Sequence, residues 1–163
     1  MHSCSNVDTS SFKKGFNNKY ISFQHPFAWE YLENDNEFVV AKLFDKKYQS
    51  VITISVAPCI TNDIEEIKEM IEADFKERNW NIQDSKVLKE NDLQAWDVIF
   101  TVIEEGRTFE IEQYNILKEN NIYTIEIASF SRSEIMTDYV SLLTSFKILK
   151  PSYKVNGDSY EKI

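Results

Sequence analysis

Acidic side chains in the second half of the chain have a spacing that could serve to bind a cation. The dipeptide Glu105-Gly106 is a tight-turn signal between two strand-like segments, because Gly accepts a positive φ. On the hairpin that this turn makes, one face carries Asp97, Glu110 and Glu112, and Glu126 joins them if the next turn keeps that register. Hard cations need several oxygen ligands at one point, so these four residues are a candidate weak calcium site. The alternative is a hydrated face or salt bridges to Lys-rich segments, since like charges on adjacent strands repel.

Motifs for nucleophilic or metal-assisted catalysis are absent from the sequence. His2 and His25 are its only histidines, and His25 has no Asp or Ser at the fixed spacing of a triad. The chain has no G-x-S-x-G, H-E-x-x-H, P-loop or dinucleotide-binding motif, and it implies no cofactor. One enzyme class stays open, a small hydrolase or transferase that works with paired carboxylates, because sequence alone rarely shows such pairs.

Length and charge restrict the class of protein and of partner. A chain of 163 residues with 42% hydrophobic content is typical of one domain with one core. Its formal charge of −9 argues against nucleic acid as a partner, which needs clustered Lys and Arg, and opposes adsorption of the bare domain to an anionic membrane. No apolar run approaches the roughly 20 residues needed to cross a bilayer. An unknown protein or small ligand remains as the partner.

The hydrophobic pattern predicts one α+β domain. Strands are expected at 20–24, 37–44, 50–56, 81–88, 93–103, 107–117 and 123–130, with a second tight turn at Asn120-Asn121. Two helices are expected at about 62–78 and 132–147, each opened by a capping pattern, Asn62 with Glu65 and Ser131 with Glu134. This order predicts an antiparallel sheet covered at least partly on both faces. The domain would span 19–150, between a disordered polar leader at 1–18 and a polar tail at 151–163.

The stretch HPFAWEY, residues 25–31, places aromatic residues around a strand break. Pro26 has no N–H to donate, so it ends the pairing of the preceding strand. We expect Phe27 and Trp29 to cap the open end of the core, since aromatic side chains bury large apolar areas. The alternative is an aromatic ligand pocket.

Several stretches together resemble the PsbP-like superfamily. They are YISFQHPFAWEY, SVITISV before a helix, AWDVIFTVIEEGRTFEIEQYNILKENNIYTIEIAS, and a closing helix that ends in LLTSFKIL. The superfamily includes the PsbP subunit of photosystem II, a nuclear-transport factor that binds the Ran GTPase, and bacterial DcrB-like lipoproteins. The resemblance covers roughly 19–149 and implies an α/β/α sandwich with a central antiparallel sheet. It implies a binding or accessory domain without a shared catalytic residue set.

The two cysteines lead to an expectation about location. They cannot make a disulfide framework or a zinc site alone, and Cys59 follows Pro58 at a strand end, as a half-buried thiol would. Cys4 follows Ser3 and precedes a polar tether, as the lipidated first residue of a mature lipoprotein does, and the resemblance to DcrB-like lipoproteins favours this hypothesis. Met1-His2 would then stand where an apolar signal had been removed. We therefore expect an extracytoplasmic, lipid-anchored domain. The alternative is a cytoplasmic protein-binding adaptor that starts natively at Met1, with Cys4 as an ordinary thiol.

Overall fold

A seven-stranded antiparallel sheet forms the centre of the protein. The structure is a computed structural model that describes residues 13–18, 20–149, 153–156 and 159–162. The strand order of the main sheet is β3-β4-β5-β9-β8-β7-β6. These strands are β3 (Glu30–Tyr31), β4 (Val39–Asp45), β5 (Ser50–Pro58), β6 (Asn81–Glu90), β7 (Leu93–Glu104), β8 (Arg107–Lys118) and β9 (Asn121–Ser129).

Two small sheets accompany the main one. The first has the order β1-β2-β10 and consists of β1 (Lys13–Asn17), β2 (Ile21–Pro26) and β10 (Lys147–Ile148). The second is a hairpin of β11 (Tyr153–Asn156) and β12 (Ser159–Lys162). The predicted leader 1–18 is therefore wrong for its last part, which forms β1, and the predicted tail 151–163 contains a hairpin. Residues 1–12, including Cys4, lie outside the described residues.

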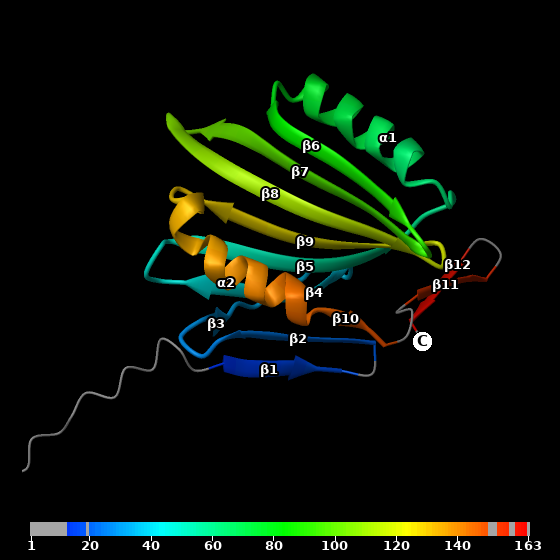
Figure 1. The fold of residues 1–163 in the computed structure, drawn as a ribbon, viewed down its shortest axis with the longest axis horizontal. Coiled ribbons are helices and arrows are strands. Elements are labelled where there is room, and N and C mark those ends of the chain that lie inside the picture. Colours follow the sequence, from blue (N-terminus) through cyan, green and yellow to red (C-terminus); the bar gives the residue numbers. More distant parts are fainter. Residues whose placement is uncertain (1–12, 19, 150–152, 157–158, 163) are drawn as a thin grey trace, which may run out of the picture.

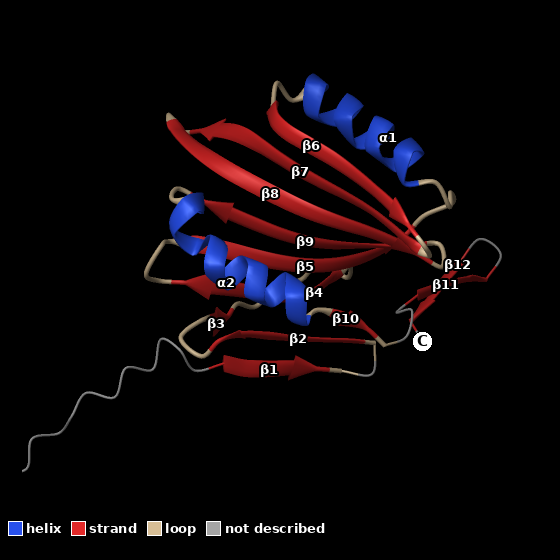
Figure 2. Ribbon diagram, in the orientation of Figure 1, coloured by secondary structure: helices blue, strands red, loops and turns tan. Residues whose placement is uncertain are grey.

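The helices α1 (Ile64–Glu77) and α2 (Arg132–Ser145) cover opposite faces of the main sheet (Figures 1 and 2). On the α1 face, helix residues such as Ile67 and Phe75 pack against Trp96 and Phe100 of β7. On the α2 face, Tyr139 and its helix neighbours pack with β2 and with the aliphatic residues of β4, β5 and β9. This arrangement confirms the predicted α/β/α sandwich.

Tight turns set the register that decides which side chains share a face. Glu105 (φ 50°) and Gly106 (φ 75°) make the two-residue turn predicted for the β7–β8 hairpin, and Phe100 faces Ile111 as expected. The next turn is formed by Glu119 (φ 50°) and Asn120 (φ 60°), one residue earlier than predicted.

The starts and ends of the two helices differ in part from the prediction. The N-cap of α1 is Asp63 rather than Asn62, and its Oδ1 accepts a hydrogen bond from the N–H of Glu65. At α2, Ser131 makes no side-chain cap; its carbonyl accepts from the N–H of Glu134 instead. The helix ends at Ser145, two residues early, because Phe146 turns to an extended conformation. Neither helix in the described part of the chain combines the length and apolarity that crossing a membrane requires.

Candidate functional site

A carboxylate pair lies between β7, β8 and the start of α2. Ile99 faces Glu112 across the hairpin, and Asp97 faces Tyr114, so the two carboxylates are diagonal neighbours on the α2 face. Arg132, the first residue of α2, donates to Glu112 from two guanidinium nitrogens. The Arg132 Nη2 and Nε atoms lie 2.6 and 3.0 Å from Glu112 Oε2. The helix start thus brings a cation to the carboxylate that is the more buried of the two.

Asp97 differs from an ordinary surface carboxylate in its protonation. Burial, the charge of Glu112 and a hydrogen bond with Glu112 raise the pKa of Asp97 to about 7, although Arg132 opposes the rise. The Oδ1 atom of Asp97 is buried, and no hydrogen-bond donor among the described residues reaches it. With a pKa of about 7, Asp97 carries a proton in a large share of the folded molecules at neutral pH, so on average it adds less than a second full negative charge beside Glu112.

The four expected cation ligands do not meet at one point. Glu110 is exposed on the α2 face. Glu126 pairs with Gln113, so it lies on the opposite face, and Gln113 Nε2 donates to Glu126 Oε2 at 2.6 Å. The expectation for Glu126 is wrong because a two-residue β8–β9 turn gives this pairing; a loop one residue longer or shorter would have reversed the face. Among the described residues no group of three or more His, Cys, Asp or Glu is arranged to hold a metal ion.

An apolar hollow lies where α2 ends. We call it the α2-end pocket; its volume is about 310 Å³, and its lining is Leu93, Ile116, Leu117, Phe146 and Ile148, with Asp92 and Lys118 as the charged members. The extended backbone at Phe146 (φ −67°, ψ 128°) stops the helix and leads the chain into β10. Apolar residues that converge on a hollow with few polar groups are typical of a binding site.

A second hollow, of about 430 Å³, lies between β1, β2 and the end of α2. Ser145 Oγ at its edge accepts a hydrogen bond from the backbone N–H of Gln24 at 2.8 Å. This hollow is lined by short polar side chains and backbone as well as by Phe16 and Phe23. Lys147 is the one charged residue of this lining, which contains no histidine, cysteine, aspartate or glutamate.

The HPFAWEY segment is mainly a packing unit. His25 is fully buried, and its ring nitrogens Nδ1 and Nε2 lie 2.8 Å from Pro26 O and Tyr31 Oη. Because a carbonyl only accepts, Nδ1 carries the proton and Nε2 accepts from the Tyr31 hydroxyl. Burial lowers the pKa of His25, which keeps the ring neutral. Trp29 stacks beside this ring and is buried as predicted, whereas Phe27 is 58% exposed and does not cap the core.

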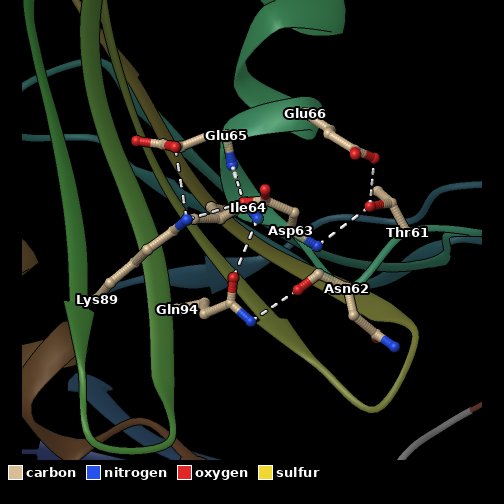
Figure 3. Close-up of polar contacts among 8 residues, drawn as sticks. All are labelled: Thr61, Asn62, Asp63, Ile64, Glu65, Glu66, Lys89 and Gln94. Carbon is tan, nitrogen blue, oxygen red and sulfur yellow. Dashed lines mark hydrogen bonds and ion pairs between the residues drawn. The ribbon is translucent and has the colours of Figure 1, made fainter.

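The loop before α1 is held by polar contacts that the sequence did not reveal (Figure 3). Gln94 of β7 bridges the loop to the helix: its Oε1 accepts from the N–H of Ile64 at 3.1 Å, and its Nε2 donates to Asn62 O at 2.8 Å. Lys89 Nζ lies 2.9 Å from Asp63 Oδ1 and 3.5 Å from Glu65 Oε2. The chain's own side chains thus occupy the helix start, which leaves it structural rather than anion-binding.

Cys59 shows no sign of activation. Its thiol donates to Thr61 O at 3.4 Å, and burial raises the pKa of the thiol. Since the thiolate is the nucleophilic form, a raised pKa makes Cys59 less reactive at neutral pH. The half-buried structural thiol expected from the sequence is what the structure contains.

Comparison with known proteins identifies the fold. No protein-family model matches the sequence, and no curated protein matches it. The solution structure of cyanobacterial PsbP (CyanoP) from Synechocystis superposes with a TM-score of 0.65 at 8% identity, over 91% of this chain and 98% of that one. LpqN, a protein involved in cell envelope biogenesis of Mycobacterium tuberculosis, superposes with a TM-score of 0.57 at 10% identity, over 84% and 90% of the two chains. A crystal structure from Bacteroides thetaiotaomicron gives 0.54 at 14% identity, over 90% of this chain and 50% of that one. The chain therefore has the PsbP-like fold.

Proposed function

We propose that this PsbP-like domain is a non-enzymatic binding or accessory domain of an extracytoplasmic lipoprotein, and that it receives an apolar group of its partner in the α2-end pocket. The observation that carries the proposal is the lining of that pocket. Five of its seven lining residues are aliphatic or aromatic, and the other two, Asp92 and Lys118, carry opposite charges. Such a lining binds an apolar group by excluding water, and the two charges can orient a polar neighbour at its edge.

The size of the pocket restricts its ligand. A volume of about 310 Å³ lies at the low end of the range for small-molecule sites. It suits one large apolar side chain of a protein partner or a compact apolar ligand. A partner that inserts one anchor residue would gain most of its affinity there, because a few buried anchors dominate binding energies.

The pocket proposal is tested with one disruptive variant and one matched control. Leu93 lines the pocket and is 40% exposed. Leu93→Asp should therefore abolish binding without removing a buried side chain from the core. Ile103 is 73% exposed at the other end of β7, so Ile103→Asp adds the same charge away from the pocket. The full chain is used as bait in an envelope extract of its own host. A partner retained by the wild type and by Ile103→Asp but lost by Leu93→Asp supports the proposal; equal retention or equal loss by the two variants contradicts it.

The carboxylate pair is what favours the second candidate, a hydrolase or transferase. A raised pKa like that of Asp97 is common among catalytic acids. Against catalysis, Glu112 is engaged by Arg132, and neither carboxylate lines the two pockets described above. We expect no turnover of generic ester, phosphate, peptide or glycoside substrates. If the wild type turned over one of these substrates and Asp97→Asn did not, the protein would be an enzyme rather than a binding domain.

We propose the location from Cys4, and the involvement of LpqN, a protein with the same fold, in cell envelope biogenesis supports it. The native gene product should carry acyl groups on Cys4 and partition with membranes. Mass spectrometry of its N-terminus measures this directly. A native chain that starts at Met1 and stays in the cytosol would favour the cytoplasmic adaptor.

A further inference from the structure

Three segments that are distant in the sequence meet at the end of the domain where β1 begins. Lys13 and Lys14 of β1 face Pro26 and His25 of β2, so the turn that carries Phe27 lies beside the start of β1. From β3, the ring of Tyr31 lies 5.8 Å from Lys14 Nζ. From the β4–β5 turn, Lys46 Nζ lies 3.2 Å from Oε1 of Glu30, the neighbour of Tyr31. We define Lys13, Lys14, Phe27, Tyr31, Lys46 and Lys47 as the β1-end surface. Figure 1 shows that the start of β1, the end of β2, β3 and the β4–β5 turn lie at the same end of the domain.

Two aromatic side chains of this surface are exposed to solvent, and the residues next to them are buried. Phe27 is 58% exposed and Tyr31 43% exposed, whereas their neighbours His25 and Trp29 are buried. The hydroxyl of Tyr31 is held by His25 Nε2, and Phe27 follows the buried Pro26. Neighbouring residues thus hold these two rings in contact with water. Exposure of their apolar area is unfavourable, and contact with an apolar surface would remove that area from water.

The local charge differs from that of the whole chain. The chain has a net charge of −9, yet four lysines lie on the β1-end surface. Two of them have acidic partners, Lys13 with Asp138 and Lys46 with Glu30, and Asp45 next to Lys46 is buried. The remaining two approach aromatic rings: Lys14 approaches Tyr31, and Lys47 Nζ lies 4.9 Å from the ring of Tyr48.

We propose that the β1-end surface rests on the anionic headgroup region of a lipid bilayer, an inference that builds on the lipoprotein anchor proposed above. Aromatic rings and lysines together are the side chains that settle at a membrane–water interface. The net charge of the chain repels the rest of the domain from an anionic bilayer, so the lysine-bearing end is the one that can approach it.

The position of the anchor agrees with this orientation. Cys4 precedes Lys13 by only residues 5–12, and a stretch of this length reaches at most about 30 Å when fully extended. An acyl chain on Cys4 would thus hold the start of β1 near the bilayer. The α2-end pocket is lined by residues of β10 and of the β6–β7 turn. These elements lie at the other end of the domain in Figure 1, so the pocket would face away from the membrane.

In the test, a lipid is attached to Cys4 chemically, so the result does not depend on lipidation in the native host. The full chain, as a Cys59→Ser variant, is coupled through Cys4 to a maleimide lipid in vesicles of phosphatidylcholine, with or without phosphatidylglycerol. Lysine acetylation is then followed by mass spectrometry. On anionic vesicles, Lys14 and Lys46 should be acetylated at least threefold more slowly than in the free chain. The exposed Lys76 of α1 and Lys118 at the pocket should react at unchanged rates.

A variant pair separates contact by this surface from general crowding at the vesicle. Phe27→Ser should lose most of the protection, whereas Ile60→Ser, which removes a 96% exposed side chain after β5, should keep it. Equal protection of all lysines, protection of none, or equal protection on vesicles without phosphatidylglycerol overturns the assignment. Protection of Lys14 in this assay together with an unmodified Cys4 in the native host would refute the lipoprotein anchor and leave the surface standing.

Discussion

Replacing Asp97 by Asn should stabilise the domain in a way that depends on pH. The pKa of Asp97 is about 7 in the folded chain and 3.8 in the unfolded chain. Between these two values the folded chain keeps a proton that the unfolded chain has released, so stability falls as pH rises through this window and is constant above it. Asn carries no charge at any pH and can still donate a hydrogen bond to Glu112, so the variant should not show this fall.

The magnitude follows from the two pKa values. Their difference corresponds to at most about 4 kcal/mol at pH 8. Asp97 is only partly buried, so solvent screens part of this free energy. We expect Asp97→Asn to be about 1–2 kcal/mol more stable than the wild type at pH 8, and to match it near pH 4.

Urea unfolding at several pH values between 4 and 8.5 measures the effect. The control is Glu110→Gln, which removes an exposed carboxylate from the same sheet face and should leave the pH profile unchanged. An Asp97→Asn variant that is less stable than the wild type at pH 8 would refute the reasoning. It would show that Asp97 is ionised in the folded chain and contributes to the ion pair with Arg132.

Three further predictions concern the core, the buried histidine and the carboxylates. Trp96 is fully buried and donates to Ser85 Oγ at 2.8 Å, so Trp96→Ala should cost about 3–5 kcal/mol; an unchanged urea midpoint would contradict its place in the core. The lowered pKa of His25 means that the unfolded chain takes up its proton first on acidification, so stability from this residue should be lost as pH falls below 6.5 through the folded pKa. An NMR titration in which His25 takes up its proton at or above pH 6.5 would disprove this. Millimolar Ca²⁺ should leave the melting temperature unchanged, because Arg132 already neutralises Glu112. If Ca²⁺ raised the melting temperature of the wild type but not that of Glu112→Gln, a calcium site that includes Glu112 would be established.

The sheet and its two faces could be predicted from the sequence because strand periodicity is local. Alternation from Trp96 to Val102 and one Gly-containing turn were enough to place Phe100 opposite Ile111. Burial of Trp29 followed from the large apolar area of an aromatic side chain next to a strand break. The exposure of Phe27 did not, because an aromatic residue in a turn is buried or exposed according to what packs beside it, and that is set by distant segments.

The candidate site depends on contacts between such distant segments, so most of it could not be predicted. Asp97 and Glu112 were placed on one face correctly. Their partner Arg132 belongs to α2, and no local sequence pattern specifies the direction in which this helix crosses the sheet. Whether the two carboxylates can bind a cation depends on Arg132, because it already pairs with Glu112. The α2-end pocket depends on Phe146 leaving the helix two residues earlier than the apolar pattern suggested.

The pairing of β5 with β9 has a consequence for how the chain folds. Strands β6 to β9 follow one another through two-residue turns, and such local hairpins close quickly. By contrast, Val51 of β5 must pair with Ala128 of β9, and Ser22 of β2 must pair with Lys147 of β10, although the two partners of each pair are far apart in the sequence. Closing such long loops costs entropy before any contact repays it, so these pairings should come late and limit the folding rate. The meander is thus the natural nucleus. The β1–β2 strands, which come first in the sequence, complete their sheet only after residue 148 has been synthesised.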